Sequence, residues 1–173
     1  MPSPITHDAQ FWIRHLNLSK HIEGGYFAEV YKSSFSVSTS FLPTDFPKET
    51  ERHICTHIYF LLEESQFSAL HRIKSDELWH FYAGHSLTVF EIEPSGNLIE
   101  HSLGADPEKN QRLFTCIKAG SWFGAALPPG SSYALVGCTV SPGFNYADFE
   151  MADRNKIISK FPQHSNLIRS LTR

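Results

Sequence analysis

Short runs in which hydrophobic and polar side chains alternate fill most of the chain from residue 26 to residue 151, and this period of two predicts β-strands. Turn-forming residues separate the runs, and the turn at Pro94-Ser95-Gly96-Asn97 predicts a hairpin. Two longer polar stretches are expected to be loops, at residues 38–51 and 106–110. The expected strands cover residues 26–37, 53–63, 68–73, 77–83, 86–93, 98–102, 113–117, 122–126, 133–139 and 148–151.

Both ends of the chain follow a different pattern. The spacing of apolar residues predicts a helix over residues 6–18. The tail, residues 153–171, is expected to form one short helix, or two that Pro162 separates. Many short strands with short turns are typical of an antiparallel sandwich or small barrel. The expected fold is therefore all-β with short N- and C-terminal helices. No repeat or linker interrupts the chain, so we expect one domain spanning residues 1–173.

The composition excludes several classes of protein. With 173 residues, 41% hydrophobic and 19% charged, the chain is typical of a globular domain with a substantial core. A net charge of −3 provides no general attraction to nucleic acid or to an anionic membrane. No apolar run approaches the roughly 20 residues of a membrane helix, and the first ten residues lack the apolar core of a secretory signal. The three scattered cysteines favour reduced, buried thiols, so we expect a cytoplasmic protein without nucleic-acid or membrane partners.

Candidate chemistry is concentrated around His71 and Glu77, which lie at the end of one expected strand and the start of the next. In a barrel, residues of one parity face the lumen, so Trp79 and Phe81 should point the same way as Glu77. An imidazole and a carboxylate at the mouth of a barrel can bind a divalent cation or act as base and acid. A surface histidine and glutamate beside a hairpin turn is the alternative that spacing alone leaves open.

This arrangement resembles the first sequence motif of the cupin superfamily, in which a glycine, two histidines, a glutamate and a second glycine follow at fixed spacing. His71, Glu77 and Gly84 occupy three of the positions. Ser65 replaces the leading glycine, and Ile73 replaces the second histidine. Isoleucine cannot coordinate a metal.

The second cupin motif finds its counterpart at Pro128-Pro129-Gly130. Its histidine position holds Tyr133, and its asparagine position holds Gly137. Two of the four positions that usually bind the metal in cupins are therefore replaced. The resemblance thus predicts a cupin pocket in which no metal or other cofactor is favoured.

Further segments are similar to the cupin_5 group, a family of unknown function also called DUF985. That resemblance covers nearly the whole chain. It implies a double-stranded β-helix, the jelly roll shared with RmlC-like sugar epimerases, and usually a homodimer. The segments that carry it are Glu23–Tyr31, Asp76–Phe81, Pro128–Gly130, Pro142–Phe144, Asp148–Glu150 and Phe161–His164.

One implied function is sugar-nucleotide chemistry. Residues 25–29 are similar to a stretch of the dTDP-4-keto sugar 3,5-epimerases, although Gly25 replaces an arginine. In those enzymes a lumen histidine is the base and a tyrosine is the acid. The resemblance assigns these roles to His71 and to Tyr133 or Tyr26, and a histidine titrates near the neutral pH that proton abstraction requires.

Two other functions remain open. In a metal-binding cupin, His71 and Glu77 would need a further ligand from His57, His80 or Tyr133, because a tight site takes three or four protein ligands. In a sensor, the lumen would bind a small molecule without turnover. The expected function is binding of a small polar ligand, such as a carbohydrate or sugar-nucleotide derivative, and isomerase activity is favoured over a metal-dependent oxygenase. The aromatic residues expected to line the pocket are Tyr26, Trp79, Phe81 and Trp122.

Overall fold

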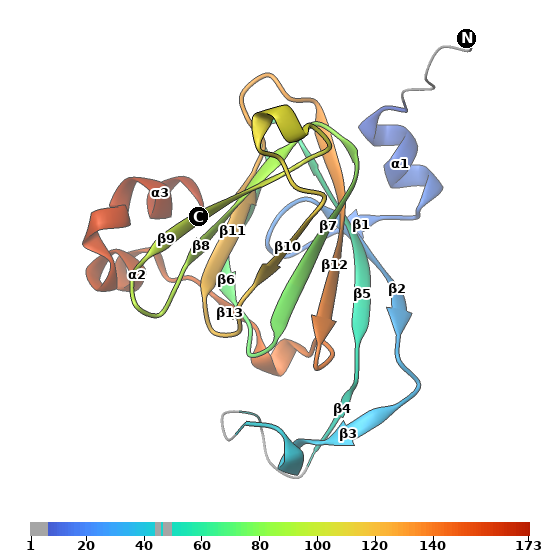
Figure 1. Ribbon diagram of the computed structural model, residues 1–173, viewed down its shortest axis with the longest axis vertical. Coiled ribbons are helices and arrows are strands. Elements are labelled where there is room, and N and C mark those ends of the chain that lie inside the picture. Colours follow the sequence, from blue (N-terminus) through green and yellow to red (C-terminus); the bar gives the residue numbers. More distant parts are fainter. Residues whose placement is uncertain (1–6, 44–45, 47–49) are drawn as a thin grey trace.

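Two antiparallel β-sheets face each other in the computed structural model, which describes residues 7–43, 46 and 50–173 (Figure 1). The first sheet contains, in spatial order, β1 (Ser19–Lys20), β2 (Tyr26–Lys32), β5 (Thr56–Glu63), β12 (Tyr133–Ser141), β7 (Asp76–Gly84) and β10 (Phe114–Ile117). The second contains β13 (Glu150–Met151), β6 (Phe67–Arg72), β11 (Trp122–Ala126), β8 (Leu87–Ile92) and β9 (Leu98–Leu103). This arrangement confirms the predicted all-β jelly roll.

The main hydrophobic core lies between the two sheets. Because successive side chains of a strand point to opposite faces, every second residue of the central strands enters this core. Phe60, Trp79 and Phe123 are each 1% exposed, and Val136 is fully buried among them. Such aromatic packing supplies much of the apolar burial that stabilises a small barrel.

Short helices cover the outer faces of the sheets (Figure 1). The helix α1 (Ala9–His15) begins after Asp8, whose carboxylate accepts a hydrogen bond from the Phe11 amide, and it packs on the first sheet. The segment α2 (Arg154–Lys160), η4 (Pro162–His164) and α3 (Ser165–Ser170) packs on the second sheet. No helix among the described residues has the length and apolar character needed to cross a membrane.

A two-stranded arm, β3 (Ser36–Ser38) and β4 (Glu51–His53), projects from one end of the barrel (Figure 1). The prediction of one strand over residues 26–37 is wrong because the chain leaves the sheet after β2 and forms this arm. Arg52 ties the arm to the barrel, since its buried guanidinium donates two hydrogen bonds to the Asp148 carboxylate at 3.1 and 3.2 Å. Asp148 belongs to η3 (Tyr146–Asp148), so the expected strand at 148–151 is reduced to β13. Between the strands of the arm lies η1 (Thr39–Phe41), and η2 (Pro107–Lys109) falls in the other expected loop.

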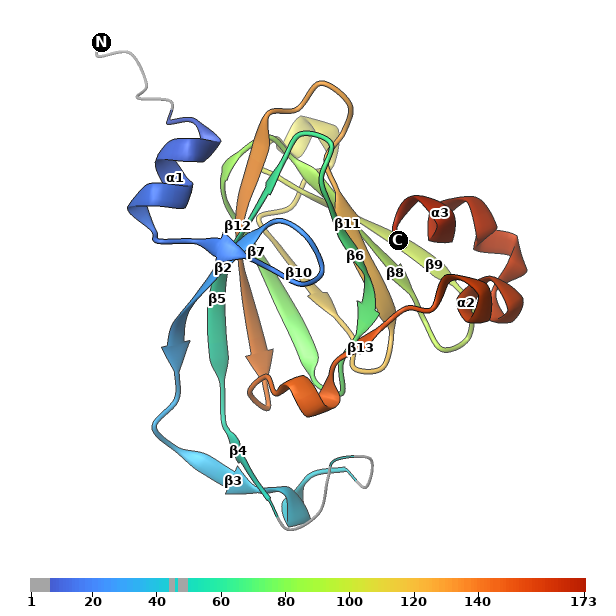
Figure 2. The ribbon, with the colours of Figure 1, turned by 180° about the vertical axis from the view of Figure 1, so that it is seen from behind.

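The loop between β1 and β2, residues 21–25, bridges the edge of the first sheet to β6 of the second (Figure 2). The Ala69 amide donates a hydrogen bond of 2.8 Å to the carbonyl oxygen of Glu23 in this loop. Gly24 and Gly25 have φ angles of 114° and 68°, a region that strongly favours glycine. A Cβ atom on Gly24 would overlap the Phe67 carbonyl oxygen. The two glycines therefore let the loop lie against β6 and point Glu23 into the barrel.

Candidate functional site

A cavity of about 100 Å³ lies between the sheets beneath the loop that carries Glu23. Apolar and aromatic side chains form much of its wall, including Phe27, Ile58, Phe144 and Phe149. Five ionisable groups that are largely withdrawn from solvent share this small space. They are His21, Glu23, His71, Glu77 and Cys138.

His71 projects from β6 into this cavity and is 2% exposed. Its Nδ1 atom lies 2.7 Å from the Ala69 carbonyl oxygen, which can only accept, so Nδ1 carries the hydrogen. The other ring nitrogen, Nε2, lies 3.2 Å from Oε2 of Glu23. Burial lowers the pKa of His71 to about 4, partly opposed by the bond to Ala69, so the imidazole is neutral at pH 7.

Glu23 is the partner of that imidazole. Its Oε1 accepts a hydrogen bond of 3.0 Å from the Ser68 hydroxyl, and His21 Nδ1 lies 3.6 Å from Oε2. Burial raises the pKa of Glu23 to about 7, while His21 and Ser68 act in the opposite direction. Because Nδ1 of His71 carries the hydrogen, its Nε2 can accept a hydrogen bond from Oε2 of Glu23 when that carboxyl group is protonated.

Glu77 is a second carboxyl group that burial keeps protonated. It lies on β7 and is 8% exposed, and burial together with the nearby charge of Glu23 raises its pKa to about 8. The Cys138 thiol and the Trp79 indole interact with it and oppose this shift. Trp79 Nε1 has no acceptor in good hydrogen-bond geometry within the described chain. Burial and the two carboxylates raise the pKa of Cys138 well above its usual value, so the thiol stays protonated.

These groups do not fit a metal centre. No cluster of three or more histidine, cysteine or acidic side chains in metal-binding geometry occurs among the residues that the structure describes. Ile73 is buried in the main core at the position where cupins carry a second histidine. His71 offers Nε2 to Glu23 rather than to an open ligand position.

His57 and His80, two of the residues that a metal-binding cupin would need as further ligands, lie on the outer face of the first sheet. His57 Nδ1 lies 2.6 Å from the Thr139 hydroxyl oxygen, and His80 Nε2 lies 3.3 Å from the same atom. The hydroxyl of Tyr82 is 3.1 Å from His57 Nε2. Alternation along the strands turns both histidines away from the lumen, so neither supplies the further ligand that a metal site at His71 and Glu77 would need.

Neither expected tyrosine acid faces His71. The Tyr133 hydroxyl donates to the His7 carbonyl oxygen at 2.7 Å and accepts from Trp12 Nε1 at 3.1 Å, beneath α1. Tyr26 packs in the same outer cluster. The prediction that Tyr133 or Tyr26 supplies the acid is therefore wrong in its geometry.

The expected aromatic lining also needs correction. Trp122 packs under α2 and α3, where the Arg72 guanidinium lies 4.7 Å from its ring centre. Trp79 and Phe81 do belong to the core between the sheets, but neither lines the cavity. Phe27, Phe144 and Phe149 take the place that these three residues were expected to fill.

The sequence predicted that His71 and Glu77 lie in one site, and both line the cavity. The other three ionisable residues of the cavity were not predicted: Glu23, His21 and Cys138. A signal for Glu23 was present in the sequence. An acidic residue directly before two glycines, between a predicted helix and a predicted strand, can be placed by the tight turn against a neighbouring strand. Nothing in the sequence predicted that Cys138 lines the cavity, because a cysteine in a strand usually packs like a small apolar residue.

Two antiparallel sheets around a closed lumen with buried ionisable groups define a small β-barrel protein of the cupin type. The family model described as "Cupin superfamily (DUF985)" matches residues 10–152, and the chain belongs to this family. The family prediction from sequence is thereby confirmed.

Solved structures agree with this assignment. A protein from Shewanella oneidensis is 35% identical with a TM-score of 0.86, over 97% of this chain and 99% of that chain. A hypothetical protein from Leishmania major is 33% identical with a TM-score of 0.86, over 96% and 99%. Oxalate decarboxylase from Bacillus subtilis is 16% identical with a TM-score of 0.53, over 88% of this chain and 36% of that chain, a likeness of fold alone. A search of curated proteins found no match.

Proposed function

We propose that this protein binds a small polar ligand in the lumen cavity and moves a proton on it, as an isomerase or epimerase. The observation that carries the proposal is the placement of Glu23, His71 and Glu77 in one buried cavity. Buried groups with strongly shifted pKa values are typical of acid–base sites, and here the pKa values of both carboxyl groups are raised toward neutrality.

The three groups divide into a base and an acid. When Glu23 is ionised, its carboxylate faces the unprotonated Nε2 of His71, so the pair lacks a proton and accepts one readily. Glu77 is protonated at pH 7 and can donate a hydrogen bond to a carbonyl oxygen of the ligand. The base removes a proton from the carbon next to that carbonyl, and charge develops on the oxygen that Glu77 contacts. In an epimerisation, a proton from solvent reaches the same carbon from the other face, and the base later releases the proton that it took. In an isomerisation, the base returns its proton to the neighbouring carbon, while Glu77 protonates the carbonyl oxygen and takes up the proton of the neighbouring hydroxyl group.

The size of the cavity limits the ligand. At about 100 Å³ it is well below the roughly 300 Å³ at which pockets for drug-sized molecules begin. A hydroxy-ketone or the reacting end of a sugar fits such a space, whereas a complete sugar nucleotide does not. We therefore favour a small carbohydrate derivative over the sugar-nucleotide substrates of the similar epimerases.

Solvent-deuterium exchange tests this function. The protein is incubated in deuterated buffer with a panel of small hydroxy-ketones, aldoses and nucleotide keto-sugars, and deuterium at the carbon next to the carbonyl is followed by NMR. We expect exchange with at least one small carbonyl compound, and a loss of about 100-fold or more in Glu77→Gln. Glu64→Gln, on an exposed carboxyl, is the matched control and should keep the wild-type rate. Absence of exchange over the whole panel would refute the catalytic proposal.

A second candidate is a sensor that binds without turnover. It is favoured by the enclosure of the site, because Glu23, His71 and Glu77 are at most 8% exposed. Saturable binding of a panel member by calorimetry, with no deuterium incorporated, would identify this function. Binding should then weaken in Glu77→Gln and stay unchanged in Glu64→Gln.

A further inference from the structure

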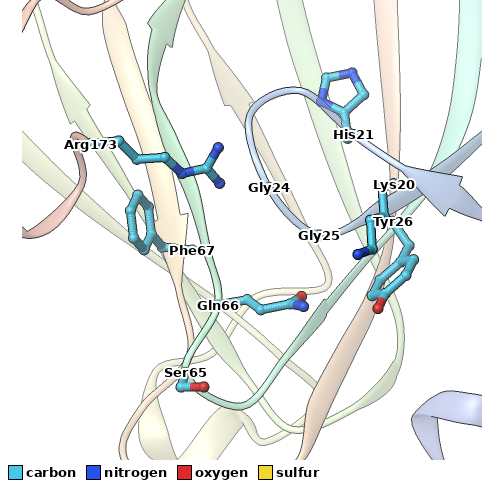
Figure 3. A pocket seen from close by; sticks show the side chains of 9 residues that line it. All are labelled: Lys20, His21, Gly24, Gly25, Tyr26, Ser65, Gln66, Phe67 and Arg173. Atoms are coloured by element: carbon cyan, nitrogen blue, oxygen red, sulfur yellow. The ribbon is translucent and has the colours of Figure 1, made fainter.

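A second cavity, of about 360 Å³, lies on the outer side of the loop that carries Glu23 (Figure 3). Arg173 and Gln66 point toward Gly24 and Gly25 of this loop, and Lys20 lies where the loop leaves β1. Nothing in the proposed lumen chemistry uses this cavity. Its volume falls in the range of pockets that bind small organic molecules.

The side chains around this second cavity make it locally positive. Lys20 and Arg173 both line it, and none of its lining residues is acidic. In the described part of the chain, no carboxylate lies within ion-pair distance of either side chain. Two unpaired cations beside one cavity contrast with the net charge of −3 of the whole protein.

Hydrogen bonds from the protein fix the donors of this cavity in place. The Arg173 guanidinium donates to the carbonyl oxygens of Ile22 and Glu23 at 3.2 and 3.3 Å, and it lies 5.6 Å from the Phe67 ring centre. An arginine has five N–H groups, so further donors of Arg173 remain for a ligand. Gln66 accepts a hydrogen bond from the Glu63 amide through Oε1 at 3.2 Å, which leaves its NH₂ group as a donor.

We propose that this cavity binds the phosphoryl group of a small phosphorylated molecule. A phosphate monoester carries close to two negative charges at pH 7, which matches Lys20 and Arg173 together. The planar guanidinium suits two phosphate oxygens, and Gln66 adds a neutral donor. A cavity of about 360 Å³ leaves room for the rest of a compact molecule such as a sugar phosphate. This proposal does not depend on the proposed proton transfer in the lumen, and it holds even if the protein has no such activity.

Calorimetric titration at constant ionic strength tests the site with three probes: inorganic phosphate, glucose 6-phosphate and ADP. We expect saturable binding of at least one probe, and the strongest one identifies whether the free ion, a sugar phosphate or a nucleotide is the source. Lys20→Ala and Arg173→Ala should each weaken binding at least about tenfold. The matched controls Lys156→Ala and Arg169→Ala remove the same charges from exposed positions of α2 and α3. They should leave the dissociation constant within about twofold.

In this titration, the proposal is overturned by no saturable binding of any probe, or by equal weakening in the site variants and the controls. Arg173→Ala also removes two bonds to the loop, so a second measurement uses the unaltered protein. Saturable shifts of the Gly24 and Gly25 amide signals on titration with the strongest probe, by NMR, would support the site. Binding that leaves both amide signals unmoved would place the ligand elsewhere and refute it.

Discussion

Replacing Glu23 with glutamine should make the protein more stable at alkaline pH while it impairs the lumen site. Glu23 is buried, and its pKa is raised from 4.5 to about 7. Between these two pH values the unfolded chain loses the Glu23 proton while the folded protein retains it. The stability that Glu23 contributes is therefore full below pH 4.5 and is lost as the pH rises through 7.

The size of this loss follows from the shift in pKa. At about 1.4 kcal/mol per pKa unit, ionisation of Glu23 costs the folded state about 3 kcal/mol above pH 7. Glutamine does not ionise, its oxygen can still accept from Ser68, and its amide can donate to Nε2 of His71. Removing the Glu23 charge also relieves Glu77, whose pKa that charge raises, so the two effects add in the same direction.

Urea unfolding at pH 5 and pH 8, at one ionic strength, measures the effect. We expect the unfolding free energy of Glu23→Gln to lie within about 1 kcal/mol of wild type at pH 5 and about 3 kcal/mol above it at pH 8. Glu64→Gln makes the same change on an exposed carboxyl and should shift stability by less than about 0.5 kcal/mol at both pH values. A buried ion pair of Glu23 with protonated His71 predicts the opposite outcome. The glutamine variant would then lose about 3 kcal/mol or more at both pH values, because the imidazolium would be left unpaired, and that result would refute the description of His71 as a neutral imidazole.

Three further changes test the framework around the site. Gly24→Ala should lower the unfolding free energy by at least about 2 kcal/mol in urea titration, because its φ of 114° and the Phe67 carbonyl both exclude a Cβ atom, whereas an equally stable variant would contradict that reading. His101→Ala should lower the unfolding free energy by about 2 to 4 kcal/mol at pH 7, because it leaves the buried Glu91 carboxylate without the imidazole 2.9 Å away. Hydrogen bonds depress the pKa of Glu91, so this loss of stability should shrink as the pH falls below 4.5. A loss that does not change with pH would contradict this explanation. Light scattering should show a homodimer, because β1 pairs with only the first two residues of β2 and leaves residues 28–32 as a free strand edge within the described chain. A monomer at high protein concentration would contradict this prediction.

The alternation of side chains was enough to predict most of the barrel. The expected strand at 122–126 coincides with β11, and the hairpin of β8 and β9 follows the predicted turn at Pro94–Asn97. The arm of β3 and β4 was missed because its strands are short and polar, so they carry too little periodicity to stand out from a loop.

The site was harder to predict because it depends on contacts between distant segments. The alternation placed Glu77 and Trp79 on the inner face, but it gave no information about how deep each side chain lies or which loop covers the lumen. Tyr133 shows the limit of motif transfer. It occupies a metal-ligand position of the cupin pattern, yet its hydroxyl bonds to Trp12 of α1 and to the His7 carbonyl oxygen before that helix, on the outer side of the sheet. Residues beyond the strand, rather than the strand itself, decide that side chain's role.

The loss of metal ligands and the gain of Glu23 are two parts of one arrangement. A cupin lumen with Ile73 and Tyr133 in ligand positions retains a histidine that burial would leave neutral and without a partner for Nε2. The loop with Gly24 and Gly25 brings a carboxyl group to that nitrogen, 3.2 Å away, in place of a cation. On the proposed function, the Glu23–His71 pair exchanges a proton with the ligand, so its activity should depend on pH through the ionisation of Glu23. The stability of Glu23→Gln and the deuterium-exchange assay therefore both depend on the ionisation of Glu23 beside His71, and they measure it independently.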